Sequence, residues 1–191
     1  MIAGLYDIFT HWHKQGTVWL VSDTHFNDNE LYIGTQKVER ANADDYVNLI
    51  NSKVGKKDTL IHLGDVGDLE AMRKVRGYKI LIMGNHDTGA TKYKEVFDEV
   101  YAGPLQIGEK LILSHEPVEC NWAFNIHGHI HAHNYKDDAR HMCICPDVTG
   151  IFEPINFNRL MKSGFISHIE TIHRDTINLA TKRSRKRGKR K

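Results

Sequence analysis

The chain has 191 residues, of which 40% are hydrophobic and 26% are charged. This composition is ordinary for a globular protein, so it excludes wholesale disorder and suits one domain or one domain with a tail. No apolar run is long enough to predict a membrane-spanning helix, and the first residues do not read as a secretory signal. The three cysteines lack CxxC spacing, which disfavours a disulfide framework and a cysteine-zinc site. We therefore expect a cytoplasmic protein.

The net charge of +2 hides an asymmetry between the body of the chain and its end. Residues 182–191 contain eight basic residues and no acidic ones, which leaves 18 basic and 24 acidic residues in 1–181. We interpret 1–181 as the folded domain and 182–191 as a basic, disordered tail. The acidic body should not bind polyanions over its whole surface. A nucleic-acid contact would therefore run through 182–191 or a local site, and a solvated tail without a partner is the alternative.

Apolar runs alternate with helical patterns along the chain, which predicts an α/β domain. Residues 36–54 have helical spacing, and either Asn42 or Asp44 suits the N-cap of that helix. Shorter helices are expected at 69–76, 91–98 and 157–163. The predicted strands are 17–22, 59–63, 79–83, 110–114, 123–127, 142–149 and 164–173.

The first five of these strands each end in a polar cluster. In chain order the cluster residues are Asp23, His25, Asp65, Asn85, His86, Asp87, His115, His129 and His131. Ligand groups in α/β folds gather at the carboxyl ends of strands, so five such ends can converge on one site. Oxygen and imidazole donors without a thiolate suit Zn, Mn, Fe or Co, whereas Ca and Mg prefer oxygen alone. The set exceeds one tetrahedral site and fits two ions that share a carboxylate, an arrangement used for displacement at phosphorus.

The same residues form five short motifs that resemble those of the calcineurin-like metallophosphoesterases. The motifs are DTH at 23–25, GD at 64–65, GNHD at 84–87, His115 and GHIH at 128–131, in that family's order and approximate spacing. The resemblance covers residues 18 to about 157. It implies an α/β fold in which two mixed β-sheets pack as a sandwich with flanking helices, in four layers. It also implies hydrolysis of phosphomonoesters or phosphodiesters with two divalent ions, manganese being favoured.

The resemblance also implies a role for each motif residue. The expected metal ligands are Asp23, His25 and His131 for the first ion, Asp65 for both, and Asn85, His115 and His129 for the second. A metal-bound hydroxide would attack phosphorus in line. His86 would act as the general acid that protonates the leaving oxygen, and Asp87 would orient His86 and keep it charged.

One departure separates the sequence from the serine/threonine phosphatase branch of that family. That branch carries a GDxxDRG pattern, whereas this chain reads GDVGDLE, with Leu69 and Glu70 in the last two places. A phosphate-clamping arginine is therefore missing there unless Arg73 or Arg76 substitutes for it in space. This departure disfavours a dedicated phosphoprotein phosphatase.

Several other residues near the motifs have structural interpretations. Three histidines are expected to pack or to lie in a loop rather than to bind metal: His62, His127 and His133. Aromatic residues at strand ends more often pack than stack on a substrate, and here they are Phe26, Trp122 and Tyr135. Three functions stay open: an enzyme acting on small phosphate esters, a nuclease or nucleic-acid end-processing phosphoesterase that uses 182–191, and a binding protein built on the same fold. The intact ligand set disfavours the third.

Overall fold

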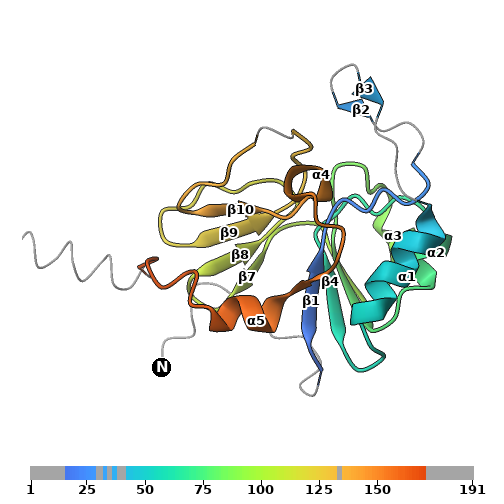
Figure 1. Cartoon of the computed structure of the whole chain (residues 1–191), viewed down its shortest axis with the longest axis horizontal. Coiled ribbons are helices and arrows are strands. Elements are labelled where there is room, and N and C mark those ends of the chain that lie inside the picture. Colours follow the sequence, from blue (N-terminus) through green and yellow to red (C-terminus); the bar gives the residue numbers. More distant parts are fainter. Residues whose placement is uncertain (1–15, 29–31, 34–35, 38–41, 133–134, 171–191) are drawn as a thin grey trace, which may run out of the picture.

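The computed structural model describes residues 16–28, 32–33, 36–37, 42–132 and 135–170. The basic tail at 182–191 and His133 lie outside the described residues. Figure 1 shows two β-sheets packed against each other, with α1, α2 and α3 beside one sheet and α5 at the lower edge of the sandwich. Among the described residues, no helix combines the length and the apolar character that a membrane crossing requires.

The first sheet has five strands in the order β11-β1-β4-β5-β6. They are β1 (Val18–Val21), β4 (Thr59–His62), β5 (Tyr78–Ile82), β6 (Glu99–Tyr101) and β11 (Ile155–Asn156). Strands β1, β4, β5 and β6 run parallel to one another, and β11 pairs antiparallel with β1. Because parallel strands share one direction, the carboxyl ends of β1, β4 and β5 lie along the same edge.

The second sheet has four strands in the order β10-β9-β8-β7. They are β7 (Leu105–Ile107), β8 (Leu111–Leu113), β9 (Phe124–His127) and β10 (His141–Cys143). Strands β8, β9 and β10 are parallel, and β7 pairs antiparallel with β8. A separate small hairpin pairs β2 (Tyr32–Ile33) with β3 (Gln36–Lys37).

The core consists of two apolar layers on opposite faces of the first sheet. Between the sheets, Ile61 and Ile80 pack with Leu113 and Ile126, all essentially inaccessible to solvent. On the other face, Leu60 packs against residues of the helices. This alternation follows from the period of two in a strand, and burial on both faces explains why these strands read as continuous apolar runs.

The outer face of the second sheet is covered by loops within the described residues. Asn125 of β9 accepts a hydrogen bond from the backbone N–H of Val118 at 2.8 Å, and the His141 ring contacts the Val118 carbonyl at 3.2 Å. The predicted sandwich of two mixed sheets with flanking helices is therefore confirmed, and the described helices α1 to α3 lie on the first sheet.

Helix α1 (Ala43–Lys53) begins later than the sequence predicted. The Asn42 side chain accepts a hydrogen bond from the backbone N–H of Asp44 at 2.9 Å, which caps the helix at that point. Residues 36–37 belong to β3 instead, so the predicted helix over 36–54 was wrong at its start.

The other helices are short. They are α2 (Leu69–Arg73), α3 (Ala90–Tyr93), α4 (Pro146–Thr149) and α5 (Phe157–Lys162). The predicted strand over 142–149 was wrong after Cys143, because Pro146 opens α4, where its missing N–H costs nothing. The predicted strand over 164–173 was also wrong in its described part. Residues 164–168 form turns, closed by local bonds such as Ser167 N–H to the Gly164 carbonyl at 2.8 Å.

Candidate metal centre

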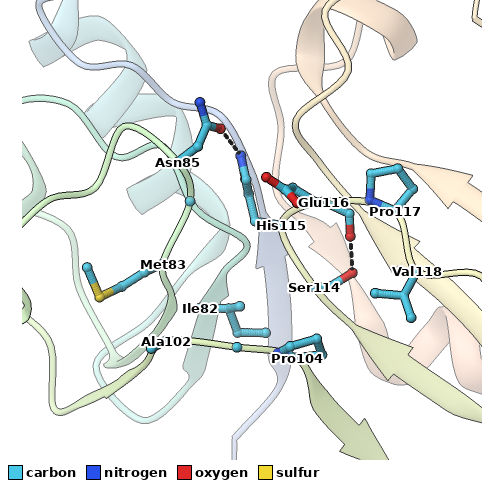
Figure 2. Close-up of a pocket in the computed structure, with 12 residues that line it drawn as sticks. Ile82, Met83, Asn85, Ala102, Pro104, Ser114, His115, Glu116, Pro117 and Val118 are labelled. Atoms are coloured by element: carbon cyan, nitrogen blue, oxygen red, sulfur yellow. Dashed lines mark hydrogen bonds between the residues drawn. The ribbon is translucent and has the colours of Figure 1, made fainter.

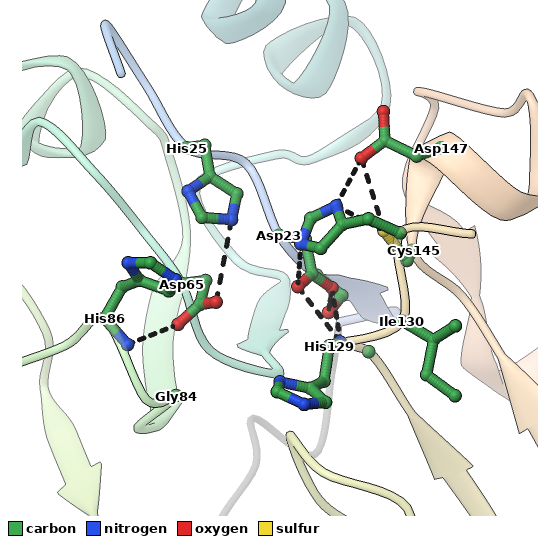
Figure 3. Close-up of polar contacts among 12 residues, drawn as sticks. Asp23, His25, Asp65, Gly84, His86, His129, Ile130, Cys145 and Asp147 are labelled. Carbon is green, nitrogen blue, oxygen red and sulfur yellow. Dashed lines mark hydrogen bonds and ion pairs between the residues drawn. The ribbon is translucent and has the colours of Figure 1, made fainter. Parts of the chain in front are cut away.

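The motif residues gather where the carboxyl ends of five strands meet, as the sequence predicted. They follow β1, β4 and β5 in the first sheet and β8 and β9 in the second. The two sheets touch directly here, because the backbone N–H of His129 donates to Asp23 Oδ1 at 3.0 Å across 106 residues of sequence. Figure 3 shows Asp23, His25, Asp65 and His129 around one small region.

An unusual backbone conformation accompanies these ligands. Four of the five described non-glycine residues with positive φ are Asp23 (49°), His25 (40°), Asp65 (58°) and His129 (65°). Left-handed backbone at a residue with a Cβ costs free energy of order 1 kcal/mol or more and tends to cluster at functional sites. Its concentration at the predicted ligands indicates that the chain accepts strain in order to aim these side chains.

One group of candidate ligands comprises Asp23, His25, Asp65 and His131, whose ligand atoms all lie within 4.8 Å of one another. His131 Nε2 is 3.5 Å from Asp23 Oδ1, and His25 Nε2 is 3.6 Å from Asp65 Oδ2. Two atoms bound to one ion at about 2.0–2.2 Å stand about 3–3.6 Å apart. The observed separations therefore suit a shared ion. We call Asp23, His25 and His131 the first half of the centre.

The remaining predicted ligands, Asn85, His115 and His129, form what we call the second half. Asn85 Oδ1 lies 2.8 Å from His115 Nε2 and 2.9 Å from His129 Nδ1, and the two ring nitrogens are 3.1 Å apart. Asp65 Oδ2 is 3.4 Å from His115 Nε2. The same Asp65 oxygen therefore lies between His25 of the first half and His115 of the second, which is the position a bridging ligand needs.

Hydrogen bonds on the far side of three imidazoles leave the inward nitrogen ready for a metal. His115 Nδ1 lies 2.8 Å from the Leu63 carbonyl. His131 Nδ1 is 2.5 Å from Asp147 Oδ2, and His25 Nδ1 is 3.1 Å from Asp28 Oδ2. Each acceptor holds the Nδ1 proton, so Nε2 presents its lone pair, which is the usual arrangement behind metal-binding histidines. The donor set therefore fits a divalent transition-metal ion.

Two motif glycines leave room for the ligand oxygens. A Cβ at Gly84 would lie 2.2 Å from Asp65 Oδ1, and one at Gly128 would lie 2.2 Å from Asp23 Oδ2. Both distances are far below a van der Waals contact, so only glycine lets the backbone come this close to the carboxylates. The glycines of the GNHD and GHIH motifs thus form walls of the candidate centre.

Burial acts to raise the pKa of both carboxylates, but their partners make the net shifts opposite in direction. Burial raises the pKa of Asp23 to about 6, against the opposing charge of His115. Burial also acts to raise the pKa of Asp65, but the hydrogen bond and charge of His115 and the backbone N–H of His86 outweigh it and lower the pKa to about 2. Burial tends to lower the pKa of His115, and the carboxylates of Asp65 and Asp23 raise it above its ordinary value. Bound cations would supply this charge compensation without a proton.

His86 and Asp87 lie on the same loop but in different surroundings. The backbone N–H of His86 donates to Asp65 Oδ1 at 2.9 Å, and its exposed ring stands edge-on to the His25 ring, with centroids 5.3 Å apart. Asp87 is buried and accepts hydrogen bonds from three backbone N–H groups: Asp65 at 2.8 Å, Gly84 at 2.9 Å and Val66 at 3.1 Å. These contacts tie the two ligand-bearing loops together. The sequence instead predicted that Asp87 orients His86.

Sequence reasoning did not find Asp28 and Asp147, which support His25 and His131. Asp28 follows its partner by three residues, a spacing that offers a weak signal in the DTHFND segment. Asp147 is 16 residues from His131 and lies on α4, in a segment that was predicted as strand. No local pattern in the sequence distinguishes it.

Four of the neighbouring residues with structural interpretations, His62, His127, Phe26 and Tyr135, make packing or hydrogen-bond contacts as expected. His62 is fully buried and hydrogen-bonded to Thr24 Oγ1 at 2.9 Å, and the buried His127 contacts the Tyr135 hydroxyl at 3.3 Å. Phe26 packs edge-on against Tyr46. Arg73 binds the Glu95 carbonyl at 3.1 Å and pairs with Glu70, so its described contacts lie away from the candidate centre.

A family model described as calcineurin-like phosphoesterase matches residues 16–141, which include all seven predicted ligands. The chain belongs to the calcineurin-like phosphoesterase family. Its fold also resembles a solved protein of unknown function from Aquifex aeolicus, with a TM-score of 0.59 and 24% identity over 77% of this chain and 98% of that one. A nuclease from Pseudomonas putida, MPE, gives a TM-score of 0.43 and 21% identity over 60% and 61% of the two chains. No curated protein gives a significant match. For this calcineurin-like phosphoesterase, the similarity to the Aquifex aeolicus structure supports the fold, and the substrate stays open.

Proposed function

We propose that this chain hydrolyses small phosphate esters, monoesters or diesters, with two divalent metal ions held at the candidate centre. The observation that carries the proposal is the place of Asp65 Oδ2, 3.6 Å from His25 Nε2 and 3.4 Å from His115 Nε2. One carboxylate oxygen is thus within reach of both halves of the centre. Two bound ions would lower the pKa of a water molecule and offset charge on the phosphoryl oxygens.

The protein residues have separate tasks in this proposal. Asp23, His25 and His131 hold one ion, Asn85, His115 and His129 hold the other, and Asp65 contacts both. His86 gives a proton to the leaving oxygen, which its exposed ring beside His25 supports. Asp87 acts on catalysis by fixing the loops of Asp65 and His86 through its three backbone N–H contacts.

The donor set suits several ions, of which manganese is the favoured one. Nitrogen and oxygen ligands without a thiolate are compatible with Mn, Fe, Zn and Co. Cys143 and Cys145 are free and buried, and burial raises the pKa of both thiols, so both stay protonated near neutral pH. Free cysteines support a location in the reducing cytoplasm.

The test is a parallel assay of metal-reconstituted protein. Protein stripped with a chelator is reloaded with each of the four ions, analysed for metal content, and assayed on p-nitrophenyl phosphate, its bis ester and 2′,3′-cyclic nucleotides. We expect two ions per chain and turnover that the chelator abolishes. Metal-free protein with undiminished turnover, or one ion per chain at saturation, would contradict the proposal.

Processing of nucleic acid is the second candidate function, because residues 182–191 carry eight basic residues. Eight such charges would make binding fall steeply with salt. The full chain and a 1–181 truncation are compared on a DNA substrate over a salt series. Equal cleavage by both forms at every salt concentration removes the basis of this candidate.

A further inference from the structure

A pocket of about 310 Å³ lies beside the second half of the centre (Figure 2). Its walls come from the end of β5, from the link between β6 and β7, and from the segment that follows β8. Asn85 and His115 line it, so a group inside the pocket would adjoin the second half directly. The volume lies at the lower end of the range for small-molecule sites. It suits a compact organic group such as an aromatic ring.

Half of the twelve residues that line this pocket have hydrophobic side chains. Its hydrophobic residues are Ile82, Met83, Ala102, Pro104, Pro117 and Val118. Among the described residues that line it, Glu116 is the one acidic residue and none is Lys or Arg. The hydroxyl of Ser114 already donates to the Glu116 carbonyl at 2.6 Å. The pocket therefore favours an uncharged apolar group and disfavours a second anionic one.

The position of His86 indicates which part of a substrate would enter the pocket. The His86 ring packs against His25 of the first half, and His86 is absent from the pocket wall. In the proposed function, His86 protonates the leaving oxygen, so the leaving group lies towards the first half. The group in the pocket is then the one that stays on phosphorus, and a monoester has no such group.

We propose that the substrate is a phosphodiester whose retained organic group is uncharged, compact and apolar or aromatic, and that this group binds in the pocket between Asn85, Ala102 and Val118. This inference rests on the proposed function and specifies its substrate class. The exposed Glu116 carboxylate repels a retained group that carries a further negative charge, so we expect the pocket to disfavour a polynucleotide strand.

The first test measures binding while turnover is suppressed. Metal-loaded His86→Asn protein, which lacks the proposed general acid and should cleave esters of poor leaving groups slowly, is titrated by calorimetry with diphenyl phosphate and with dimethyl phosphate. We expect diphenyl phosphate to bind about 10- to 100-fold more tightly, from burial of one ring. Ala102→Phe and Val118→Phe, which fill the pocket from two sides, should each remove most of this preference. Ala139→Phe places the same side chain at an exposed position away from the pocket and should keep it.

A second test follows the retained group during turnover. Phenyl p-nitrophenyl phosphate and methyl p-nitrophenyl phosphate share a leaving group and differ in the group that stays. We expect kcat/KM to be about 10- to 100-fold higher for the phenyl ester. Adding a 4-carboxylate to the retained ring should lower kcat/KM severalfold, and Glu116→Gln should recover that loss. Glu119→Gln, an exposed glutamate of the same loop outside the pocket wall, should not recover it.

The outcomes separate this inference from the proposed function. Hydrolysis of the methyl ester without preference for the phenyl ester, together with equal binding of the two phosphates, overturns the pocket assignment and leaves the proposed function intact. A binding preference that Ala102→Phe and Val118→Phe both leave unchanged overturns the assignment as well. Protein that binds two ions and hydrolyses p-nitrophenyl phosphate but neither diester overturns this inference and leaves the proposed function intact. Protein that binds two ions but hydrolyses neither diester nor p-nitrophenyl phosphate contradicts the proposed function, and the calorimetric preference then decides the pocket by itself.

Discussion

The two halves of the candidate metal centre are supported in different ways. In the first half, carboxylates stand behind the imidazoles, with Asp28 against His25 and Asp147 against His131. In the second half, His115 is supported by the Leu63 carbonyl, and the exposed Asn85 contributes a neutral amide. The first half also contains the fully buried Asp23, whereas the second half adjoins the open pocket.

This difference implies that the two halves bind their metal ions with different affinities. A carboxylate behind an imidazole makes its inward nitrogen a stronger ligand, and a buried anionic ligand binds a cation more strongly than an amide does. We therefore expect the first half to hold its ion more tightly and the second half to exchange its ion with solvent.

The largest effect should come from the residue that both halves share. Asp65→Asn weakens one ligand of each ion, so we expect loss of both ions and of turnover down to background. Elemental analysis of the purified variant and a p-nitrophenyl phosphate assay check this. Asp45→Asn, an exposed residue of α1, is the matched control. Retention of both ions by the Asp65 variant would contradict a shared carboxylate.

Substitution of His86 tests whether this residue, which lies beside the first half, protonates the leaving oxygen. His86→Asn should keep both ions, because no contact of the ring with the other ligands is required to hold them. Turnover should fall about 10²–10⁴-fold for alkyl esters, whose leaving oxygen needs a proton. The fall should be much smaller for p-nitrophenyl esters, and equal losses for both kinds of ester would remove His86 from the acid role.

Asp147 offers a way to weaken one half alone. Asp147→Asn removes the charge behind His131, and we expect the affinity of the tighter ion to fall about 10- to 100-fold. Competition with a chelator of known affinity measures both ions in one titration.

Asn85→Ala should instead release the weaker ion and leave the tighter one in place. Identical losses in the two variants would show that the halves do not differ.

The last expected change is in the stability of the metal-free protein. Burial raises the pKa of Asp23 from 3.8 to about 6, so the folded protein without ions favours the protonated carboxyl. The stability from this preference is complete below about pH 3.8 and is lost as the pH rises through about 6, at a cost of about 3 kcal/mol near pH 7.5. Asp23→Asn should therefore raise the free energy of unfolding in chelator at pH 7.5, with little gain at pH 4. Urea denaturation at both pH values checks the sign.

The sequence predicted the candidate site well where a ligand motif directly follows an apolar strand. Each ligand motif follows directly after a continuous apolar run, and the parallel pairing of β1, β4 and β5 places Asp23, Asp65 and Asn85 at one edge. The smaller strands β6, β7 and β11 have two or three residues, which is too short for any periodicity to register. Asp147 was missed because its role depends on how α4 folds back against His131, which is a tertiary property.

The contact between Asp23 and the His129 amide also bears on the order in which the chain assembles. Ligands 106 residues apart in sequence can meet only after both sheets have formed and docked, so the centre has high contact order and closes late in folding. A nascent chain that has not yet emerged beyond His131 lacks a ligand of the first half. Full metal loading therefore reports that the strand ends of both sheets that carry the predicted ligands have come together.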